Sequence, residues 1–123
     1  MLGSDELIGF VPTTNPVRAR AFYEDVLGLD LVEETPYACV FQANGTMLRV
    51  TVVEELAPAP FTVLGWSVDD IAATIAELSQ RGVSFERYTG VEQDELGIWH
   101  PPSGGQVAWF KDPDGNTLSL TQF

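Results

Sequence analysis

The sequence predicts an α+β fold built from two βαβββ modules in tandem. Each half of the chain is expected to form a strand, a helix and then further strands. Gly28 and Gly82 stand at matching places, where each predicted helix ends. Apolar residues alternate along the predicted strands, so one face of each sheet should pack on its helix. The other alternates should line a concave face.

The first half begins with a strand at about residues 7–11. Asn15 is a good N-cap and Pro16 suits the first helical position, and apolar residues then recur at helical spacing up to Gly28. Strands are expected at residues 29–34, 37–42 and 46–53. The last two flank Asn44-Gly45, which is typical of a tight hairpin turn. A proline-containing connector at 55–61 ends this half.

The second half repeats this plan. A strand is expected at 62–68, followed by a helix over 69–82 with acidic residues at its start and Ile71, Ile75 and Leu78 on one face. Further strands are predicted at 83–88, 97–100, 106–111 and 117–123, in that order along the chain. A Pro-Gly loop, PPSGG, separates the second and third of these.

Charge and composition exclude several classes of partner. The chain contains six Lys and Arg residues and eighteen Asp and Glu residues, which gives a net charge of −12 at pH 7. A protein that binds nucleic acid needs a basic surface, so neither nucleic acid nor an anionic membrane is an expected partner.

No run approaches the roughly 18 apolar residues of a membrane helix. The first residues lack the pattern of a secretory signal, so a cytoplasmic location is expected. Cys39, the only cysteine, is predicted to be a small core residue.

The chain contains three distinctive segments, ARAFYEDVLGLDLVEE, GWSVDDIAATIAELSQRGV and VAWFKDPDGNTLSLTQ. Together they resemble the vicinal oxygen chelate superfamily, the glyoxalase, bleomycin-resistance and extradiol-dioxygenase group. The resemblance covers nearly the whole chain. It implies one domain over 1–123, with modules at 1–57 and 61–123 forming an open, cup-shaped mixed β-sheet with outer helices. Because this fold hosts many activities, the resemblance specifies the fold more than the function.

The resemblance also locates the metal site of metal-dependent members, whose four inward ligands are usually His, Glu or Gln. Those positions fall on Ile8, Arg49, Val63 and Ser119. Isoleucine and valine offer no lone pairs, arginine repels a cation, and a lone serine is a poor ligand. His100 is the only histidine. The sequence therefore predicts no metal cofactor, and no metal-dependent lyase, dioxygenase or thiol-transfer chemistry.

Arg49 lies in an otherwise apolar strand at a position expected to face the cup. Hairpin geometry places it opposite Val40, on one face with Met47. A buried arginine needs a partner. Arg49 could bind a carboxylate or phosphate of a ligand, or it could pair with one of the many acids or extend to water.

Aromatic residues offer a second set of candidates. Trp109 is expected opposite Ser119 in the last hairpin, where it could form an aromatic wall for a flat ligand or fill the core. Trp66 has the opposite parity to Val63 and is expected to pack on a helix. Trp99 precedes the Pro-Pro loop, which is expected to border the pocket.

His100 is the best candidate for any acid–base role, although a lone histidine beside a loop is more often structural or exposed. Tyr88 is a further candidate for hydrogen bonding or for catalysis. Neither has a partner that the sequence fixes.

Three functions follow from these features. The first is a metal-free, bleomycin-resistance-like protein that binds a small molecule of unknown identity for sequestration or transport. Its cup would be lined by Arg49, Trp109, Ser119 and Met47, with Trp99 and His100 at the edge. The second is a metal-independent isomerase or lyase using His100 or Tyr88, and the third is a protein-interaction module. A binding protein is expected rather than an enzyme, and no cofactor is expected. The sequence does not determine the charge of the ligand. A homodimer is expected, because it would cover the exposed sheet edges.

Overall fold

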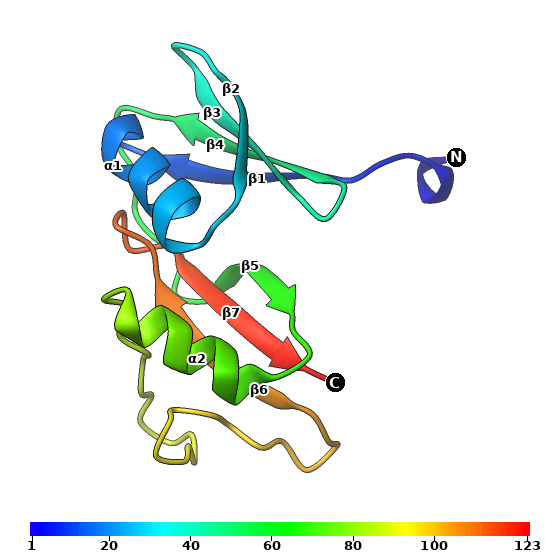
Figure 1. Ribbon diagram of the computed structural model, residues 1–123, viewed down its shortest axis with the longest axis vertical. Coiled ribbons are helices and arrows are strands. Elements are labelled where there is room, and N and C mark those ends of the chain that lie inside the picture. The colour runs from blue at the N-terminus through cyan, green and yellow to red at the C-terminus, as the bar shows by residue number, and fades with distance from the viewer. The chain divides into compact units, whose positions relative to one another are not determined.

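The computed structural model describes residues 1–123, which divide into two compact units, each with its own sheet and helix (Figure 1). We call Met1–Ala57 unit 1 and Pro58–Phe123 unit 2. The expected α+β class is confirmed, with seven strands in two mixed sheets. No helix is long and apolar enough to cross a membrane.

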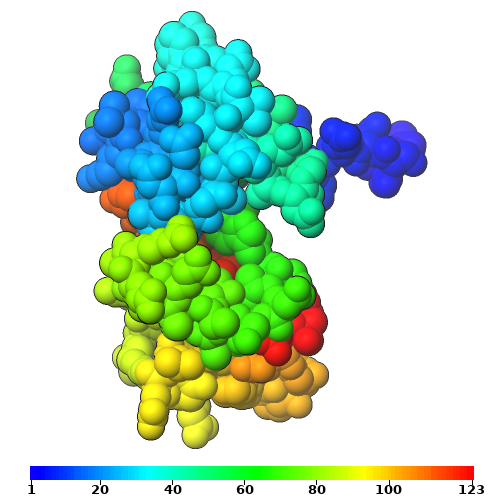
Figure 2. Space-filling view, viewed as in Figure 1, coloured from blue at the N-terminus to red at the C-terminus, as the bar shows by residue number.

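Unit 1 contains a four-stranded sheet with one parallel strand pair. Its order is β1-β4-β3-β2, in which β1 runs parallel to β4 and the other neighbours are antiparallel. A short 3-10 turn precedes β1, has no buried residue and projects from the rest of the unit (Figure 2). The elements of unit 1 are η1 (Leu2–Ser4), β1 (Ile8–Thr13), α1 (Pro16–Arg20), η2 (Ala21–Val26), β2 (Asp30–Glu34), β3 (Ala38–Ala43) and β4 (Thr46–Val52).

The helix of unit 1 begins as the sequence predicts and ends differently. The Asn15 side chain accepts a hydrogen bond from the backbone N–H of Arg18 at 3.1 Å, and Pro16 opens the helix. From Ala21 the backbone widens into a π-helix, η2, which ends before Gly28. Tyr23, in this wider turn, is fully buried, with its ring 5.9 Å from that of Phe41. Helical spacing of apolar residues does not distinguish a π-turn from an α-turn, so the sequence predicted one continuous helix.

The hairpin between β3 and β4 closes at Asn44-Gly45. Both residues have positive φ, 47° and 81°, which is the geometry that favours Asn-Gly in two-residue turns. The turn fixes the register that places Val40 opposite Arg49, as predicted.

The core of unit 1 lies between the sheet and the helix. Cys39 belongs to it and is fully buried, which confirms the prediction of a core cysteine. Burial, reinforced by the charge of Glu34, raises the pKa of the Cys39 thiol. The largest fully buried side chains on the helix side are Tyr23, Phe41, Val11 and Val50, whereas Val40 is also buried but lies on the opposite face, across from Arg49.

Unit 2 contains a three-stranded sheet with α2 across one face (Figure 1). The order is β5-β7-β6, with β5 parallel to β7 and β6 antiparallel to it. Asp70 caps α2 by accepting from the backbone N–H of Ala73 at 3.0 Å. Trp66 stacks on the buried ring of Phe110 at 6.4 Å, on the helix side as predicted. The elements of unit 2 are β5 (Thr62–Ser67), α2 (Ile71–Gln80), β6 (Gln106–Lys111) and β7 (Thr117–Gln122).

The strands predicted at 83–88 and 97–100 are not formed. Only three isolated bridges occur there, Phe85 with Phe110, and Trp99 with both Gln93 and Val107. Side chains satisfy the backbone instead. The Gln93 amide donates to the carbonyls of Glu86 and Gly97 at 2.9 and 2.7 Å. These side-chain bonds take the place of a continuous ladder, which alternation alone could not reveal.

The turn between β6 and β7 is held by the buried carboxylate of Asp112, which is 5% exposed. One oxygen accepts from the backbone N–H groups of Asp114 and Asn116, and the other accepts from the Asn116 side chain at 2.8 Å. Gly115 supplies a positive φ of 87°. The turn sets the predicted register, with Trp109 opposite Ser119.

Candidate functional site

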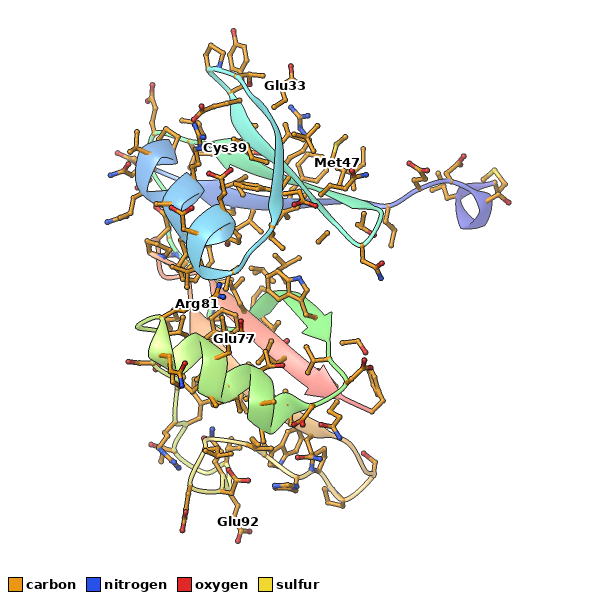
Figure 3. The ribbon with its side chains drawn as sticks, in the orientation of Figure 1. Glu33, Cys39, Met47, Glu77, Arg81 and Glu92 are labelled. Carbon is orange, nitrogen blue, oxygen red and sulfur yellow. The ribbon has the colours of Figure 1, made fainter.

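The predicted site residues form two sets, one in each unit. Met47 and Arg49 lie on the sheet face of unit 1 that is turned away from α1, which we call open face 1. Figure 3 shows Glu33 and Met47 projecting from this side of the sheet. Trp109 and Ser119 lie on the corresponding face of unit 2, which we call open face 2. His100 lies apart, beside a loop cavity described below.

Open face 1 is a row of side chains across the sheet. Arg49 pairs with Phe10 on one side and with Val40 on the other. Paired residues of adjacent strands share a face, so Arg49 stands between two apolar side chains. Ile8 lies beside Met47 on the same face. Phe10 is 61% and Ile8 48% exposed, so the surface on the β1 side of Arg49 is apolar and open, whereas Val40 on the β3 side is buried.

Arg49 is half-buried and makes no hydrogen bond or ion pair within the chain. The other five basic residues all have interaction partners, which makes Arg49 the exception among six. The residue is only partly exposed to water, and no carboxylate of the chain pairs with its charge. The expected alternative of an internal salt bridge is therefore not what the structure shows. The partnered residues are Arg18, Arg20, Arg81, Arg87 and Lys111.

Open face 2 is built around Ser119, which is 8% exposed. Its neighbours across the sheet are Trp109 and Gly65. A Cβ at Gly65 would lie 2.5 Å from the Ser119 hydroxyl oxygen. Any residue other than glycine at position 65 would therefore clash with the hydroxyl in its present position. No group of the chain hydrogen-bonds that hydroxyl, which leaves it free to bind a ligand.

Two further aromatic rings surround Trp109. Trp99 stacks on it with centroids 6.0 Å apart, and Tyr88 meets it edge-on at 5.4 Å. Burial raises the pKa of Tyr88, the charge of Glu86 adds to this, and a hydrogen bond with Thr117 opposes it, so the phenol is neutral near pH 7. The aromatic cluster was not predicted as a group. Its signal was the Pro-Gly loop, because closing it places Trp99 opposite Val107, two residues from Trp109.

His100 has an acidic partner that the sequence did not identify. Its Nε2 lies 3.0 Å from Oδ2 of Asp94, while Oδ1 accepts from the backbone N–H groups of Leu96 and Ile98 at 2.9 Å. Burial opposes ionisation of Asp94, but the hydrogen bonds from His100 and the two N–H groups outweigh it and lower its pKa.

The dyad of His100 and Asp94 borders an open cavity of about 450 Å³ within unit 2. Trp99 takes part both in this cavity and in the aromatic cluster. The imidazole itself is more than half exposed, with 56% of its side-chain surface accessible. The cavity is lined by Glu92, Gln93, Asp94, Trp99, His100 and Pro102.

The family was identified by comparison with models of known protein families. The model of the Glyoxalase/Bleomycin resistance protein/Dioxygenase superfamily matches residues 8–120. The chain belongs to this superfamily. This confirms the resemblance noted in the sequence, whose three segments lie within the matched range except for the last two residues of the third, Thr121 and Gln122.

Solved structures with the same fold cover nearly the whole chain. Lactoylglutathione lyase from Agrobacterium tumefaciens is 20% identical, with a TM-score of 0.75 and coverage of 97% of this chain and 93% of its own. TnmS3, an antibiotic binding protein from Streptomyces sp. CB03234, is 26% identical, with a TM-score of 0.73 and coverage of 99% and 98%. A superfamily member from Sphaerobacter thermophilus DSM 20745 is 19% identical, with a TM-score of 0.76 and full coverage of both chains. No curated protein matches the chain.

The four positions that the sequence resemblance assigns to the metal ligands lack the chemistry to bind a divalent ion. Unit 1 places Ile8 and Arg49 on its open face, and unit 2 offers Val63 and Ser119. Together these residues supply one neutral hydroxyl and one fixed positive charge. No group of three or more His, Cys, Asp or Glu side chains lies close enough to hold a metal ion. The residues present therefore do not fit the metal of the metal-dependent members.

Proposed function

We propose that this protein binds a small, flat molecule on open face 2 without a metal. The observation that carries this proposal is the free Ser119 hydroxyl beside Trp109, whose ring is extended by Trp99 and Tyr88. Aromatic rings of this kind stack on planar ligands, and a hydroxyl beside them can fix the orientation of the ligand.

Sequestration, as in resistance by drug binding, is the role that fits these features best. A relative with the same fold is named as an antibiotic binding protein, and the residues at the metal positions do not suit a lyase that needs a metal. The proposal includes a homodimer, which would cover the unpaired edges of β1 and β5. It also includes a cytoplasmic location.

Tryptophan fluorescence tests the proposal, because the three tryptophans occupy different places. A panel of planar aromatic compounds is titrated into the wild-type protein and into Trp109→Ala, with Trp66→Phe as the matched control. Trp66 packs on the helix side, so its variant should keep the wild-type affinity. Loss of the Trp109 ring should weaken binding at least about tenfold, in line with the loss of a central aromatic contact.

Two results would count against binding on open face 2. One is that no compound in a broad panel changes the fluorescence, which would favour the protein-interaction module. The other is that Trp109→Ala and Trp66→Phe weaken binding equally. Mass spectrometry of molecules released on denaturation would identify any ligand that copurifies.

The dyad of His100 and Asp94 favours a second candidate, metal-independent acid–base catalysis. The carboxylate orients the imidazole within hydrogen-bonding distance, beside a cavity large enough for a small substrate. The raised pKa of Tyr88 makes that residue a poor base near pH 7. Under this hypothesis His100→Ala should abolish turnover while leaving ligand affinity unchanged. Unaltered turnover in this variant would eliminate His100.

A further inference from the structure

We infer that open face 1 binds the carboxylate group of an apolar organic acid, with Arg49 as the donor. This inference extends the proposed function, since it names a class of ligand, but it depends on residues of unit 1 alone. The sequence resemblance assigns Arg49 to a metal position of the superfamily, and the strand register places it in the central row of open face 1.

The first argument is the isolation of the charge. The chain contains eighteen acidic residues and only six basic ones, and five of the six basic residues have partners within the chain. A half-buried arginine gains more from a partner than a fully exposed one, because less water surrounds it. Arg20, which is also half-buried, pairs with Glu24 and Glu34. Arg49 nevertheless has none. The missing counterion is therefore best supplied by a ligand, and a guanidinium binds a carboxylate with two parallel hydrogen bonds.

The second argument is the apolar surface around the guanidinium. Phe10, Ile8 and Met47 lie on the same face and remain partly or largely exposed. An exposed apolar patch next to one charge suits a ligand with a hydrocarbon or aromatic body and a single anionic group. Inorganic anions would use the charge but not the patch.

The third argument concerns the sign of the ligand. Glu33 lies in the same cross-strand row, on the far side of Val40, and forms no ion pair with Arg49. The net charge of −12 disfavours anions at long range. Selection for a carboxylate must therefore come from direct contact with Arg49, which predicts a strong response to a change at this residue.

A matched series of probes tests the inference on the full chain. The probes are 2-naphthoate, 2-naphthalenemethanol and 2-naphthylmethylammonium, which share a ring system and differ in charge. Isothermal titration calorimetry should show the carboxylate binding at least about tenfold more tightly than the alcohol, which corresponds to one good charge-assisted interaction. The ammonium probe should bind no better than the alcohol at open face 1.

Variants assign the preference to Arg49. Arg49→Gln should abolish the difference between carboxylate and alcohol, and Arg49→Lys should keep part of it because lysine retains charge but not the planar fork. Arg81→Gln is the matched control. It removes the same charge from an exposed pair with Glu77 and should keep the full preference.

Amide shifts in NMR spectra locate the probe and separate this inference from the proposed function. Carboxylate-dependent shifts should fall on Ile8, Phe10 and Met47, and they should vanish in Arg49→Gln. Equal affinity for carboxylate and alcohol, or equal losses in Arg49→Gln and Arg81→Gln, would overturn the inference. Binding that depends on Trp109 without any effect of Arg49 would reject the carboxylate site and leave the proposed function standing.

Discussion

Corresponding cross-strand rows on the open faces of the two sheets differ in the size and the charge of their side chains. In unit 1 the row runs Phe10, Arg49, Val40, and in unit 2 it runs Gly65, Ser119, Trp109. The first row places a cation among apolar groups, whereas the second places a free hydroxyl between a glycine and an aromatic ring. The helix-side faces of both sheets, in contrast, are closely packed and apolar. The repeated module thus keeps its core while its open face is free to change chemistry.

The largest expected effect tests the shared part of this comparison. Phe41 of unit 1 and Phe110 of unit 2 are both fully buried on the helix side. Truncation of either to alanine should lower the free energy of unfolding by about 3–5 kcal/mol, because each leaves a large cavity. Urea unfolding measures the change. A loss below about 1 kcal/mol in only one of the two variants would show that the two cores are not equivalent.

The turns that close the two last hairpins should differ in their contribution. Asp112→Ala removes a buried carboxylate that accepts three hydrogen bonds, and we expect a loss of about 2–3 kcal/mol. In unit 1, Asn44→Ala affects an exposed turn residue with a positive φ, and a loss of about 1 kcal/mol is expected. Similar losses in urea unfolding would contradict this difference between the turns.

The pair of Gly65 and Ser119 should be coupled. Gly65→Ala drives a methyl group into the Ser119 hydroxyl and should cost about 1–3 kcal/mol. Removing the hydroxyl in Gly65→Ala/Ser119→Ala should recover most of this loss, although the Ser119 carbonyl, 3.3 Å from the new Cβ, limits the recovery. Phe10→Ala, the counterpart in unit 1, is largely exposed and should cost less than about 1 kcal/mol. Additive losses in the double variant would mean that Ser119 moves freely away.

Local sequence patterns were sufficient to predict which residues pair across the strands of the two hairpins. Alternation placed Arg49 opposite Val40 and Trp109 opposite Ser119, and the turn residues at 44–45 and 112–116 fixed both hairpins. The segment from 83 to 105 was predicted less well. Its backbone is held by Gln93, Arg87 and Asp94, whose side chains bond to residues several positions away.

For the candidate sites too, the sequence predicted the positions of residues along strands but not their contacts with distant residues. Sequence position was sufficient to place Arg49 on an open face, but not to show that it lacks a partner. That property depends on where all eighteen acidic residues lie. The contact between His100 and Asp94 was likewise beyond the sequence, because it is made by an irregular loop with no period to follow.

The smallest effect concerns that loop, which has no counterpart in unit 1. The pKa of Asp94 is lowered in the folded protein, so its contribution to stability is present above the pKa of the unfolded chain, about 3.9. It is lost as the pH falls through the folded value. Wild type should therefore exceed Asp94→Asn in stability at pH 7 and lose this advantage below about pH 4. The difference should stay under about 1 kcal/mol, because the pair with His100 is exposed to solvent.

Glu92→Gln is the control for this pH dependence, because Glu92 lines the same cavity and accepts no hydrogen bond. Its urea unfolding curves from pH 7 to pH 3 should follow those of wild type. His100→Ala should remove part of the advantage at pH 7, whereas the backbone N–H groups of Leu96 and Ile98 would still hold the carboxylate. A stability difference between wild type and Asp94→Asn that persists unchanged at pH 3 would show that Asp94 acts through packing and not through its charge.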